Sequence, residues 1–364
     1  MIQAAFLHGA RDIRIEEIPD QSPGPGEVLL DVMAVGICGS DLHTYLNGEI
    51  GGTVATSPII LGHEAAGRVA ALGPGLADRF QIGQLVAIDP AIHCGECERC
   101  QSGQHHLCTK LQFMGLFPRH GALRTRMVHP AEQCIALPAG VDAVSAALLE
   151  PLGVALHAIR LARIALNDDV LIIGCGAIGL LLVQLARLSG ARRVFVSDQH
   201  AWRLEAAQTF GADHLLNAHD GDVVQYVHDA TGQRGVDVAI ESAWVKDTAN
   251  QCVEAARHGG HVVIVGIPAE DSITIRASPA RRKEIALDLS RRMNHVYPAS
   301  IDLLTRGKVV LHTLATHRFP LSQTANALET AASYREGVVR AMVLPNETEP
   351  EVSGARKEKI ASAQ

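Results

Sequence analysis

The sequence lacks both long apolar runs and blocks of charge of one sign. Its longest uncharged apolar segment, residues 170–183, is shorter than the ~20 residues that a membrane-spanning helix needs. The formal charge of −7 carries no block of one sign, which argues against nucleic acid or membranes as partners; the run Arg281-Arg282-Lys283 is followed directly by Glu284 and is read as a solvated turn. The start lacks a basic segment followed by a sustained apolar run, so we expect no signal peptide and a cytoplasmic protein.

The composition is that of a globular protein of two domains. Hydrophobic residues make up 47% and charged residues 20% of 364 residues, a length that exceeds one ordinary hydrophobic core. The sequence has eight cysteines, and in a reducing compartment these are thiols or metal ligands more often than disulfides. Their spacing therefore carries information.

Two kinds of periodicity divide the chain. Residues 2–92 show short alternating apolar runs broken by Gly and Pro, which predicts an all-β unit. The stretch DAVSAALLEPLGVALHAIRLA has a helical period, and after Asn167 strands and helices alternate, which predicts a parallel sheet covered on both faces. In this region we expect a helix that ends at Gly259-Gly260, a strand in HVVIVG and a last strand in EIALDLS. From residue 346 onward the sequence is polar and predicts a frayed tail.

A glycine loop lies between a predicted strand and a predicted helix in VLIIGCGAIGLLL. Gly174 allows a tight turn, Gly176 lets the backbone approach a pyrophosphate, and Gly179 lets helix and strand pack closely. The helix N-terminus then faces the negative charge of the phosphates. Because the glycines occur in this context, a dinucleotide site is favoured over a loop that only packs a helix.

An acid ends the next predicted strand. Asp198 stands where a carboxylate accepts hydrogen bonds from a ribose 2′-hydroxyl, and it would repel a 2′-phosphate. Arg203, five residues later, could meet such a phosphate instead. The acid should dominate while it is ionised, so we predict NAD as the cofactor.

Four cysteines lie within CGECERCQSGQHHLC. Cys94, Cys97, Cys100 and Cys108 supply four thiolates in one short loop, which predicts a closed, structural zinc site. An iron–sulfur cluster uses comparable spacing, but the sequence has no other feature of electron transfer.

Cys38 stands apart from that group, in GICGSDLHTYLNGEI. Possible partners are His63 and Glu64 in LGHEAAG and Glu150 in EPLGVALHA. A cysteine, a histidine and a glutamate are a ligand set that leaves a fourth position of zinc open for chemistry. Singly, each residue also has an ordinary explanation: a small buried apolar group, a core histidine and a carboxylate at a helix start.

The order of these motifs resembles that of the zinc-dependent medium-chain dehydrogenases. GICGSDLH, LGHEAAG, the cysteine lobe, EPLGVALHA, the glycine loop and THRFPL together span nearly the whole chain, and EPLGVALHA and THRFPL look most like the sorbitol (L-iditol) and related polyol dehydrogenases. The resemblance implies an α/β fold in which a Rossmann domain is inserted into a GroES-like, β-rich catalytic domain. The expected parts are residues 1–152 (catalytic domain, with the zinc lobe at 93–109), 153–290 (NAD domain), 291–345 (return to the catalytic domain) and 346–364 (polar tail). Family members are commonly homodimers or homotetramers.

The resemblance also implies roles for single residues. Cys38, His63 and Glu64 match ligands of a catalytic zinc, and Glu150 matches a glutamate that binds zinc or its water. Ser40 and His43 match a proton relay. The residues expected to touch NAD are Ile178, Asp198, Arg203, Val265, Gly266 and Ile267, beside the glycines. The residues expected to meet the substrate are Thr44, Ile50, Phe113 and Arg291.

We therefore predict an NAD-dependent enzyme with two zinc ions per chain that oxidises a secondary alcohol of a small polyol to give a ketose. Thr44 and the pair Arg291-Arg292 depart from the aromatic residue and the Arg-Tyr pair of sorbitol enzymes, so the identity of the polyol is open. L-Threonine 3-dehydrogenase and sugar or sugar-phosphate dehydrogenases share these motifs. A protein of another class, one that senses dinucleotides without catalysis, is the remaining alternative.

Overall fold

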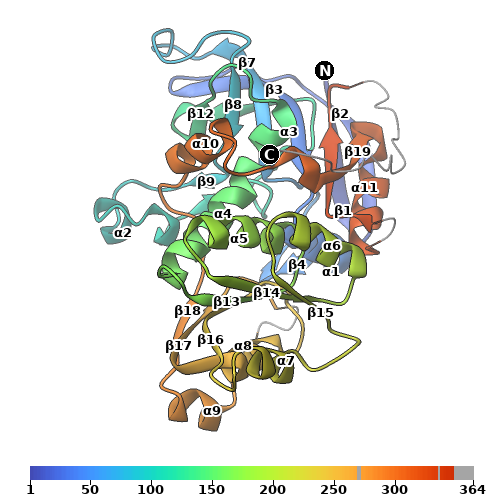
Figure 1. The fold of residues 1–364 in the computed structure, drawn as a ribbon. Helices are drawn as coiled ribbons and strands as arrows, with labels where there is room; N and C mark the ends of the chain where they lie inside the picture. Colours follow the sequence, from blue (N-terminus) through green and yellow to red (C-terminus); the bar gives the residue numbers. More distant parts are fainter. Residues whose placement is uncertain (269–271, 335–336, 348–364) are drawn as a thin grey trace.

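The computed structural model describes residues 1–268, 272–334 and 337–347. It has two lobes (Figure 1), one rich in β-strands and one built around a parallel sheet. The tail expected at 346–364 lies outside the described residues, apart from Asn346 and Glu347. The predicted fold class is confirmed, including the insertion of one lobe into the other.

The β-rich lobe, which is expected to be the catalytic lobe, is centred on a seven-stranded sheet. Its strands are in the order β12-β8-β7-β3-β20-β19, and β11 pairs with β3 as well. Their bounds are β3 Glu27–Gly36, β7 Glu64–Leu72, β8 Leu85–Ile88, β11 Arg126–Pro130, β12 Cys134–Ala136, β19 Ala315–Pro320 and β20 Arg340–Leu344. The last strand, β20, runs antiparallel to β3, with Met342 opposite Gly36. The C-terminal strands β19 and β20 therefore complete a sheet whose other strands come from residues 27–136.

A smaller sheet and several short elements complete this lobe. The order β2-β1-β6 joins β1 Ile2–Gly9, β2 Asp12–Ile18 and β6 Ile59–Ile60, and the short pairs are β4 Glu49–Ile50 with β5 Thr53–Val54 and β9 Ala91–Ile92 with β10 Gln112–Phe113. Its helices are α1 Gly39–Asn47, α2 Glu98–Gln101, α3 Ala143–Ala147, α10 Tyr297–Thr305 and α11 Thr324–Ala332. The prediction that residues 2–92 are all β was wrong at α1, whose first turn is stabilised by Asp41 accepting a hydrogen bond from the N–H of Cys38.

The second lobe contains six parallel strands in the order β15-β14-β13-β16-β17-β18. Their bounds are β13 Asp169–Ile173, β14 Arg193–Asp198, β15 His214–Asn217, β16 Val236–Glu241, β17 Ala256–Ile264 and β18 Ala286–Leu289. The strand order reverses between β13 and β16, and in such sheets ligands bind at this point, beyond the carboxyl ends of the strands. The strand expected in EIALDLS is confirmed as β18.

Helices cover both faces of this sheet (Figure 1). They are α4 Leu149–Ala162, α5 Ala177–Leu188, α6 Ala201–Thr209, α7 Val223–Ala230, α8 Thr248–Ala255 and α9 Ala277–Arg282. The prediction of a helix ending at Gly259-Gly260 was wrong, because α8 ends at Ala255 and the glycines lie inside β17. Gly260 is required there by close packing, since a Cβ would come within 2.8 Å of the carbonyl oxygen of Arg257.

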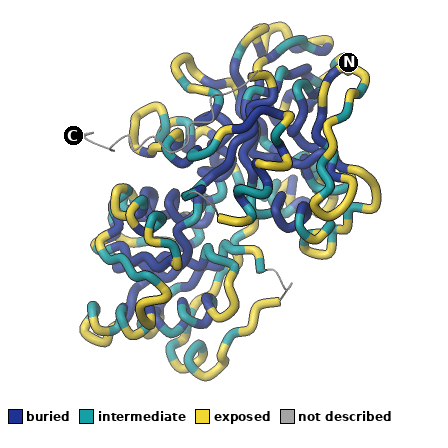
Figure 2. The backbone as a smooth tube through the Cα atoms, turned by 90° about the vertical axis from the view of Figure 1, so that its right-hand side faces the viewer, coloured by how far each residue is buried: buried dark blue, intermediate teal, exposed yellow. Residues whose placement is uncertain are grey.

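Apolar side chains of the central strand β13 are buried by the helices on both sides. Val170, Leu171 and Ile172 have no exposed surface. Burying one such side chain stabilises the fold by ~1.5–3 kcal/mol. Figure 2 shows buried segments running through both lobes, with exposed segments mainly in loops and outer turns.

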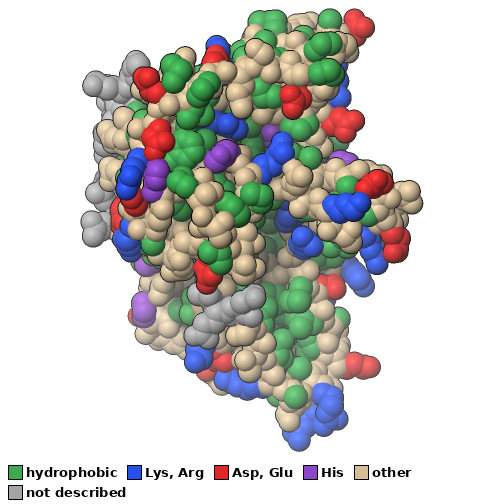
Figure 3. Space-filling view, turned by 180° about the vertical axis from the view of Figure 1, so that it is seen from behind, with side chains coloured by type: hydrophobic (Ala, Val, Ile, Leu, Met, Phe, Trp, Pro, Cys, Tyr) green, Lys and Arg blue, Asp and Glu red, His purple; other side chains and the backbone are tan. Residues whose placement is uncertain are grey.

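The two lobes meet at a cleft. The space-filling view from behind shows a hollow between them, and acidic and basic side chains are scattered over this face without a large patch of one sign (Figure 3). Residues of both lobes line a cavity of about 1010 Å³ at the cleft. Among the described residues, no helix is both long and apolar enough to cross a bilayer.

Candidate active site

The four-cysteine lobe lies in the loop between β9 and β10. The Sγ atoms of Cys94, Cys97, Cys100 and Cys108 all lie within 4.8 Å of one another. The Sγ of Cys94 is 3.9 Å from that of Cys100 and 3.5 Å from that of Cys108. A tetrahedron with Zn–S bonds of ~2.3 Å has sulfur–sulfur edges of roughly 3.8 Å, so this spacing fits zinc.

Backbone N–H groups prepare the lobe for a cation. The N–H of Cys97 points at the Sγ of Cys94, and that of Lys110 points at the Sγ of Cys108, each at 3.4 Å. Backbone N–H groups of Cys100 and Thr109 lower the pKa of Cys97 to about 5. Thiolates are the form that binds metal, and four of them leave no position for a substrate.

A second group gathers in the cleft from two segments of the chain. Cys38 precedes α1, His63 precedes β7 and Glu64 begins it, and their ligand atoms lie within 4.8 Å of one another. Both carboxylate oxygens of Glu64 are buried without a hydrogen-bond partner, which fits a carboxylate that ligates a cation. The donor set fits zinc with an open position.

Asp41 stabilises this group from behind. Its carboxylate accepts hydrogen bonds from the N–H of Cys38 at 2.9 Å and of Gly62 at 3.1 Å, and lies 3.4 Å from Nδ1 of His63. Burial opposes a charge on His63, but Asp41 and Cys38 outweigh it and raise its pKa well above the usual value. A carboxylate at Nδ1 orients the ring so that Nε2 can act as a metal ligand.

Arg340 compensates the charge of Glu64. Its Nη2 is 3.2 Å from Oε1 of Glu64, and its Nη1 donates to the carbonyl oxygen of Ile37 at 2.6 Å. Both side chains are almost completely buried. Because Arg340 belongs to β20, the end of the chain contributes directly to this site.

Glu150 lies in the first turn of α4 and lines the same cavity, outside the compact group of Cys38, His63 and Glu64. Burial raises the pKa of Glu150 to about 7, with His63 opposing the shift and Glu64 adding to it. This geometry favours Glu64 as the direct ligand and Glu150 as a neighbour.

Three of the four residues that were expected to meet the substrate line the cavity. Ile50, Phe113 and Arg291 line the cavity. Thr44 does not; it is buried and its hydroxyl donates to the carbonyl oxygen of Ser40 at 3.3 Å, so nothing in this geometry supports a substrate contact.

Arg292 is a more prominent feature of this wall. Its guanidinium lies 3.9 Å from the centre of the Phe113 ring and 3.9 Å from Asp89, without a hydrogen bond among the described residues. Burial lowers its pKa, with Glu150 and Asp89 opposing the shift.

Of the two relay residues, Ser40 lies beside the metal group, and His43 lies at the contact between the lobes without lining the cavity. The hydroxyl of Ser40 is 3.3 Å from Nε2 of His63. His43 is buried on α1, and its ring stacks on Trp244 of the other lobe with centroids 4.2 Å apart. Burial lowers the pKa of His43, although the backbone of Ile267 opposes the shift.

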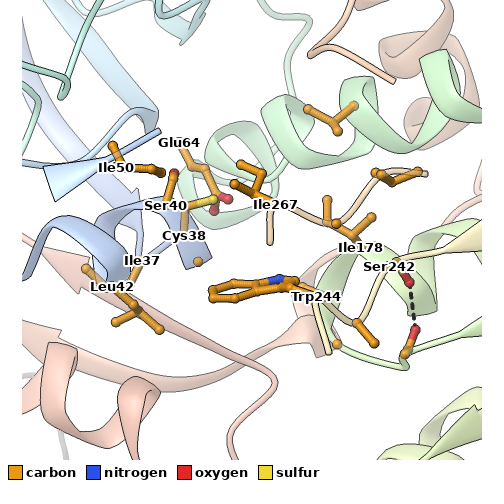
Figure 4. A pocket seen from close by; sticks show the side chains of 18 of the residues that line it. Ile37, Cys38, Ser40, Leu42, Ile50, Glu64, Ile178, Ser242, Trp244 and Ile267 are labelled. Atoms are coloured by element: carbon orange, nitrogen blue, oxygen red, sulfur yellow. Dashed lines mark hydrogen bonds between the residues drawn. The ribbon is translucent and has the colours of Figure 1, made fainter. Parts of the chain in front are cut away.

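Trp244 crosses the cleft between the two lobes. Figure 4 shows its indole lying between the segment of Cys38 and Ser40 and that of Ile178 and Ser242. Gly39 is required beneath it, because a Cβ there would come within 2.3 Å of the indole. The carboxylate of Glu241 accepts from the N–H groups of Ala243 and Trp244, which fixes the turn that carries the indole.

The glycine loop has the geometry that its sequence predicts. Gly174 adopts φ +96°, and a Cβ on Gly179 would lie 1.8 Å from the carbonyl oxygen of Gly174. Gly176 caps α5, and a Cβ there would have Nη1 of Arg203 as its nearest neighbour, at 3.9 Å. Asp198 accepts hydrogen bonds from the N–H groups of Cys175 and His200 and lies 3.7 Å from Arg203. The loop offers close backbone approach and a helix N-terminus, which fits a dinucleotide pyrophosphate.

The other expected cofactor residues complete that wall. Ile178, Val265, Gly266 and Ile267 line the cavity together with Asp198 and Arg203. The N–H of Val265 donates to the carbonyl oxygen of Glu241 at 2.8 Å, which keeps this turn beside the one that carries Trp244.

Four residues at the site were missed from the sequence: Asp41, Trp244, Arg292 and Arg340. Asp41 had a local signal, since an acid three residues after Cys38 can cap the helix that starts there. Arg292 follows Arg291, the member of that pair that was expected to meet the substrate. Trp244 and Arg340 lie far from the motifs in sequence, and only the fold brings them to the cleft.

The comparisons with known proteins agree with this geometry. Residues 24–139 match the family model of the alcohol dehydrogenase GroES-like domain, and residues 177–306 match that of the zinc-binding dehydrogenases. Sorbitol dehydrogenase of Bacillus subtilis is 37% identical, over 95% of this chain and 98% of its own. L-Idonate 5-dehydrogenase of Vitis vinifera is 34% identical, over 90% of this chain and 91% of its own.

A solved structure extends the agreement to three dimensions. The zinc-binding dehydrogenase of Sinorhizobium meliloti bound to NADP superposes with a TM-score of 0.87 at 32% identity, over 95% of this chain and 99% of that one. Sequence and structure match across both lobes, so the chain is a member of the zinc-dependent medium-chain dehydrogenases of the alcohol dehydrogenase superfamily.

Proposed function

We propose that the chain oxidises a secondary alcohol of a polyol to the ketone of a ketose, with transfer of a hydride to NAD and release of a proton. The observation that carries this proposal is the group of Cys38, His63 and Glu64 in a cavity that also contains the glycine loop. Relatives named for sorbitol and L-idonate support a substrate with several hydroxyl groups.

Each residue near the cavity has a distinct proposed task. Cys38, His63 and Glu64 would hold zinc, which when bound supplies a Lewis acid that lowers the pKa of the alcohol hydroxyl. Ser40, beside His63, would take the hydroxyl proton, and His43 would pass it towards solvent. Arg292 has unpartnered guanidinium nitrogens, so it is suited to hold a distal hydroxyl group of the polyol.

The first test is a substrate panel with purified, zinc-loaded protein. NADH formation is measured with sorbitol, xylitol, erythritol, L-idonate, L-threonine and glucose. We expect turnover with at least one polyol and little with L-threonine or glucose. Turnover with L-threonine alone would assign the chain to another member of the superfamily, and no turnover with any substrate would favour a dinucleotide sensor.

The second test concerns the cofactor. We propose NAD because Asp198 stands at the end of β14, although Arg203 and the NADP-bound relative keep NADP in question. We expect kcat/KM to be higher with NAD, and Asp198→Ala to reduce that preference. A higher kcat/KM with NADP in the unmodified protein would contradict the proposed role of Asp198.

The assembly and the cell compartment remain predictions. We expect a homodimer or homotetramer in light scattering, and a cytoplasmic location by fractionation.

A further inference from the structure

A second cavity, of about 600 Å³, lies on the catalytic lobe, outside the active site. It is a groove lined by segments near residue 22, residues 118–120 and the strand β11. Pro118 and Arg119 line both this groove and the large cleft, so the groove lies behind a loop that forms part of the cleft wall.

Arg124 in this groove is a buried charge without a partner. Only 7% of the surface of this residue is exposed. Its Nε has no hydrogen-bond partner, and among the described residues its guanidinium forms no hydrogen bond or ion pair. Partly removing an unpaired charge from water costs free energy, and an anion bound in the groove would offset this cost.

Two other buried charges among the described residues are compensated by ion pairs. Asp169, with no exposed surface, accepts from both Arg192 and Arg193, and Arg340 lies against Glu64. Arg124 differs from all of these, because its charged neighbour is Arg119, which repels it.

The other side chains of the groove do not neutralise Arg124. Glu27 is the acid that lines it, and its Oε2 accepts from the N–H of Gly24 at 3.0 Å instead. His120 accepts a hydrogen bond from the N–H of Ile60 at Nδ1, so its Nε2 carries the proton and can donate. Burial, with Arg124 adding to it, lowers the pKa of His120, which keeps this ring neutral.

His129 is the second histidine that lines the groove. Its Nε2 lies 3.2 Å from the carbonyl oxygen of Asp89, and burial lowers its pKa to about 4, with Arg119 and Arg124 adding to the shift. The groove therefore has two guanidinium groups and a neutral donor ring, against one carboxylate. Arg119 already donates to Gln112 through Nη1 at 2.8 Å, so Arg124 is the guanidinium without a hydrogen bond.

We propose that the groove around Arg124 binds a small oxyanion, such as phosphate or a carboxylate, held by the guanidinium of Arg124 with Arg119 and Nε2 of His120 as further donors. An arginine fork matches the geometry of such anions. The site is independent of the dehydrogenase reaction, and its occupant would support the loop of Pro118 and Arg119 from behind.

The test uses the full chain and inorganic phosphate as the probe. Thermal unfolding is followed at constant ionic strength, with phosphate replacing chloride, for the unmodified protein and Arg124→Met. We expect phosphate at ten times half-saturation to raise the Tm of the unmodified protein by about 2 °C. Phosphate also stabilises proteins non-specifically, so the measured quantity is the difference between the two proteins.

In the absence of phosphate, Arg124→Met should raise the Tm rather than lower it. Methionine fills similar volume and removes the unpaired charge, so the Tm of the variant in chloride should exceed that of the unmodified protein. Its saturable response to phosphate should be lost. Arg124→Lys, which keeps the charge but loses the fork, should weaken half-saturation about tenfold.

The matched control is Arg68→Gln, which removes one exposed guanidinium from the same lobe. We expect its phosphate response to equal that of the unmodified protein. An equal response in Arg124→Met would overturn the proposal, as would a lower Tm of that variant in chloride. If Arg124→Met instead lost its subunit partners in light scattering, and the unmodified protein ignored phosphate, an acid of a second copy would be the occupant and the free-anion site would be refuted.

Discussion

The two candidate metal groups are built in different ways. The four-cysteine lobe takes all its ligands from one loop, and short backbone hydrogen bonds to sulfur shape it. The group of Cys38, His63 and Glu64 takes its ligands from two separate segments and depends on Asp41 and Arg340 around it. A local site can be altered with little effect on chemistry, whereas a site assembled by the fold couples chemistry to distant residues.

The largest expected effect is on catalysis at the assembled site. Cys38→Ser should lower kcat/KM by roughly a thousandfold or more, because Lewis-acid stabilisation is worth several kcal/mol and ~1.4 kcal/mol is a factor of ten. Steady-state kinetics and metal analysis measure this, and we expect one zinc per chain to remain. Cys134→Ser, in a buried thiol outside both groups, is the control and should keep its activity.

A substitution in the four-cysteine lobe should lower the stability of the protein and leave catalysis largely unchanged. Cys100→Ser should lower the Tm by roughly 10 °C or more, because zinc binding contributes directly to folding free energy. The kcat of the folded fraction should change less than about threefold. A loss of kcat as large as that of Cys38→Ser, at full folding, would show that the lobe is not a separate local unit.

A smaller effect on catalysis is expected at Asp41, which contacts Cys38 and His63 without being a ligand itself. Asp41→Asn should lower kcat/KM or zinc affinity about 10–100-fold, because partners of metal ligands orient them. Asp31→Asn, which alters an exposed acid paired with Arg126, is the matched control. Zinc competition assays with a chelator would separate affinity from turnover, and equal behaviour of the two variants would exclude an orienting role.

The smallest effect concerns the contact between lobes. Trp244→Ala should lower kcat/KM up to about tenfold, because aromatic pairs contribute ~0.5–1.5 kcal/mol and the indole holds His43 in place. Trp244→Phe should retain most activity. The pH profile of kcat should shift in Trp244→Ala only, and an unchanged profile in both variants would argue against positioning of His43.

This contrast also explains what the sequence could reveal. The spacing of Cys94, Cys97, Cys100 and Cys108 predicted their assembly because neighbours in a short loop must be close in space. The glycine loop was equally readable, since a strand, three glycines and a helix are consecutive. Cys38, His63 and Glu64 were assigned through resemblance, because no local rule places them together.

The remaining differences have physical causes. Helix α1 was not predicted because its nine residues are too few to distinguish a helical period from the strand-like alternation of apolar and polar residues around it. Trp244 and Arg340 could not be found, because sheet pairing and the meeting of two lobes bring them to the site.

The pairing of β20 with β3 sets a condition on how the protein is made. The N–H of Ile37, next to Cys38, donates to the carbonyl oxygen of Ala341, near the end of the described chain. During synthesis this bond cannot form until Ala341 has left the ribosome, whereas the four-cysteine loop emerges complete much earlier. The loop can therefore take up its metal on the nascent chain, while the cleft acquires its final shape only after β20 has emerged.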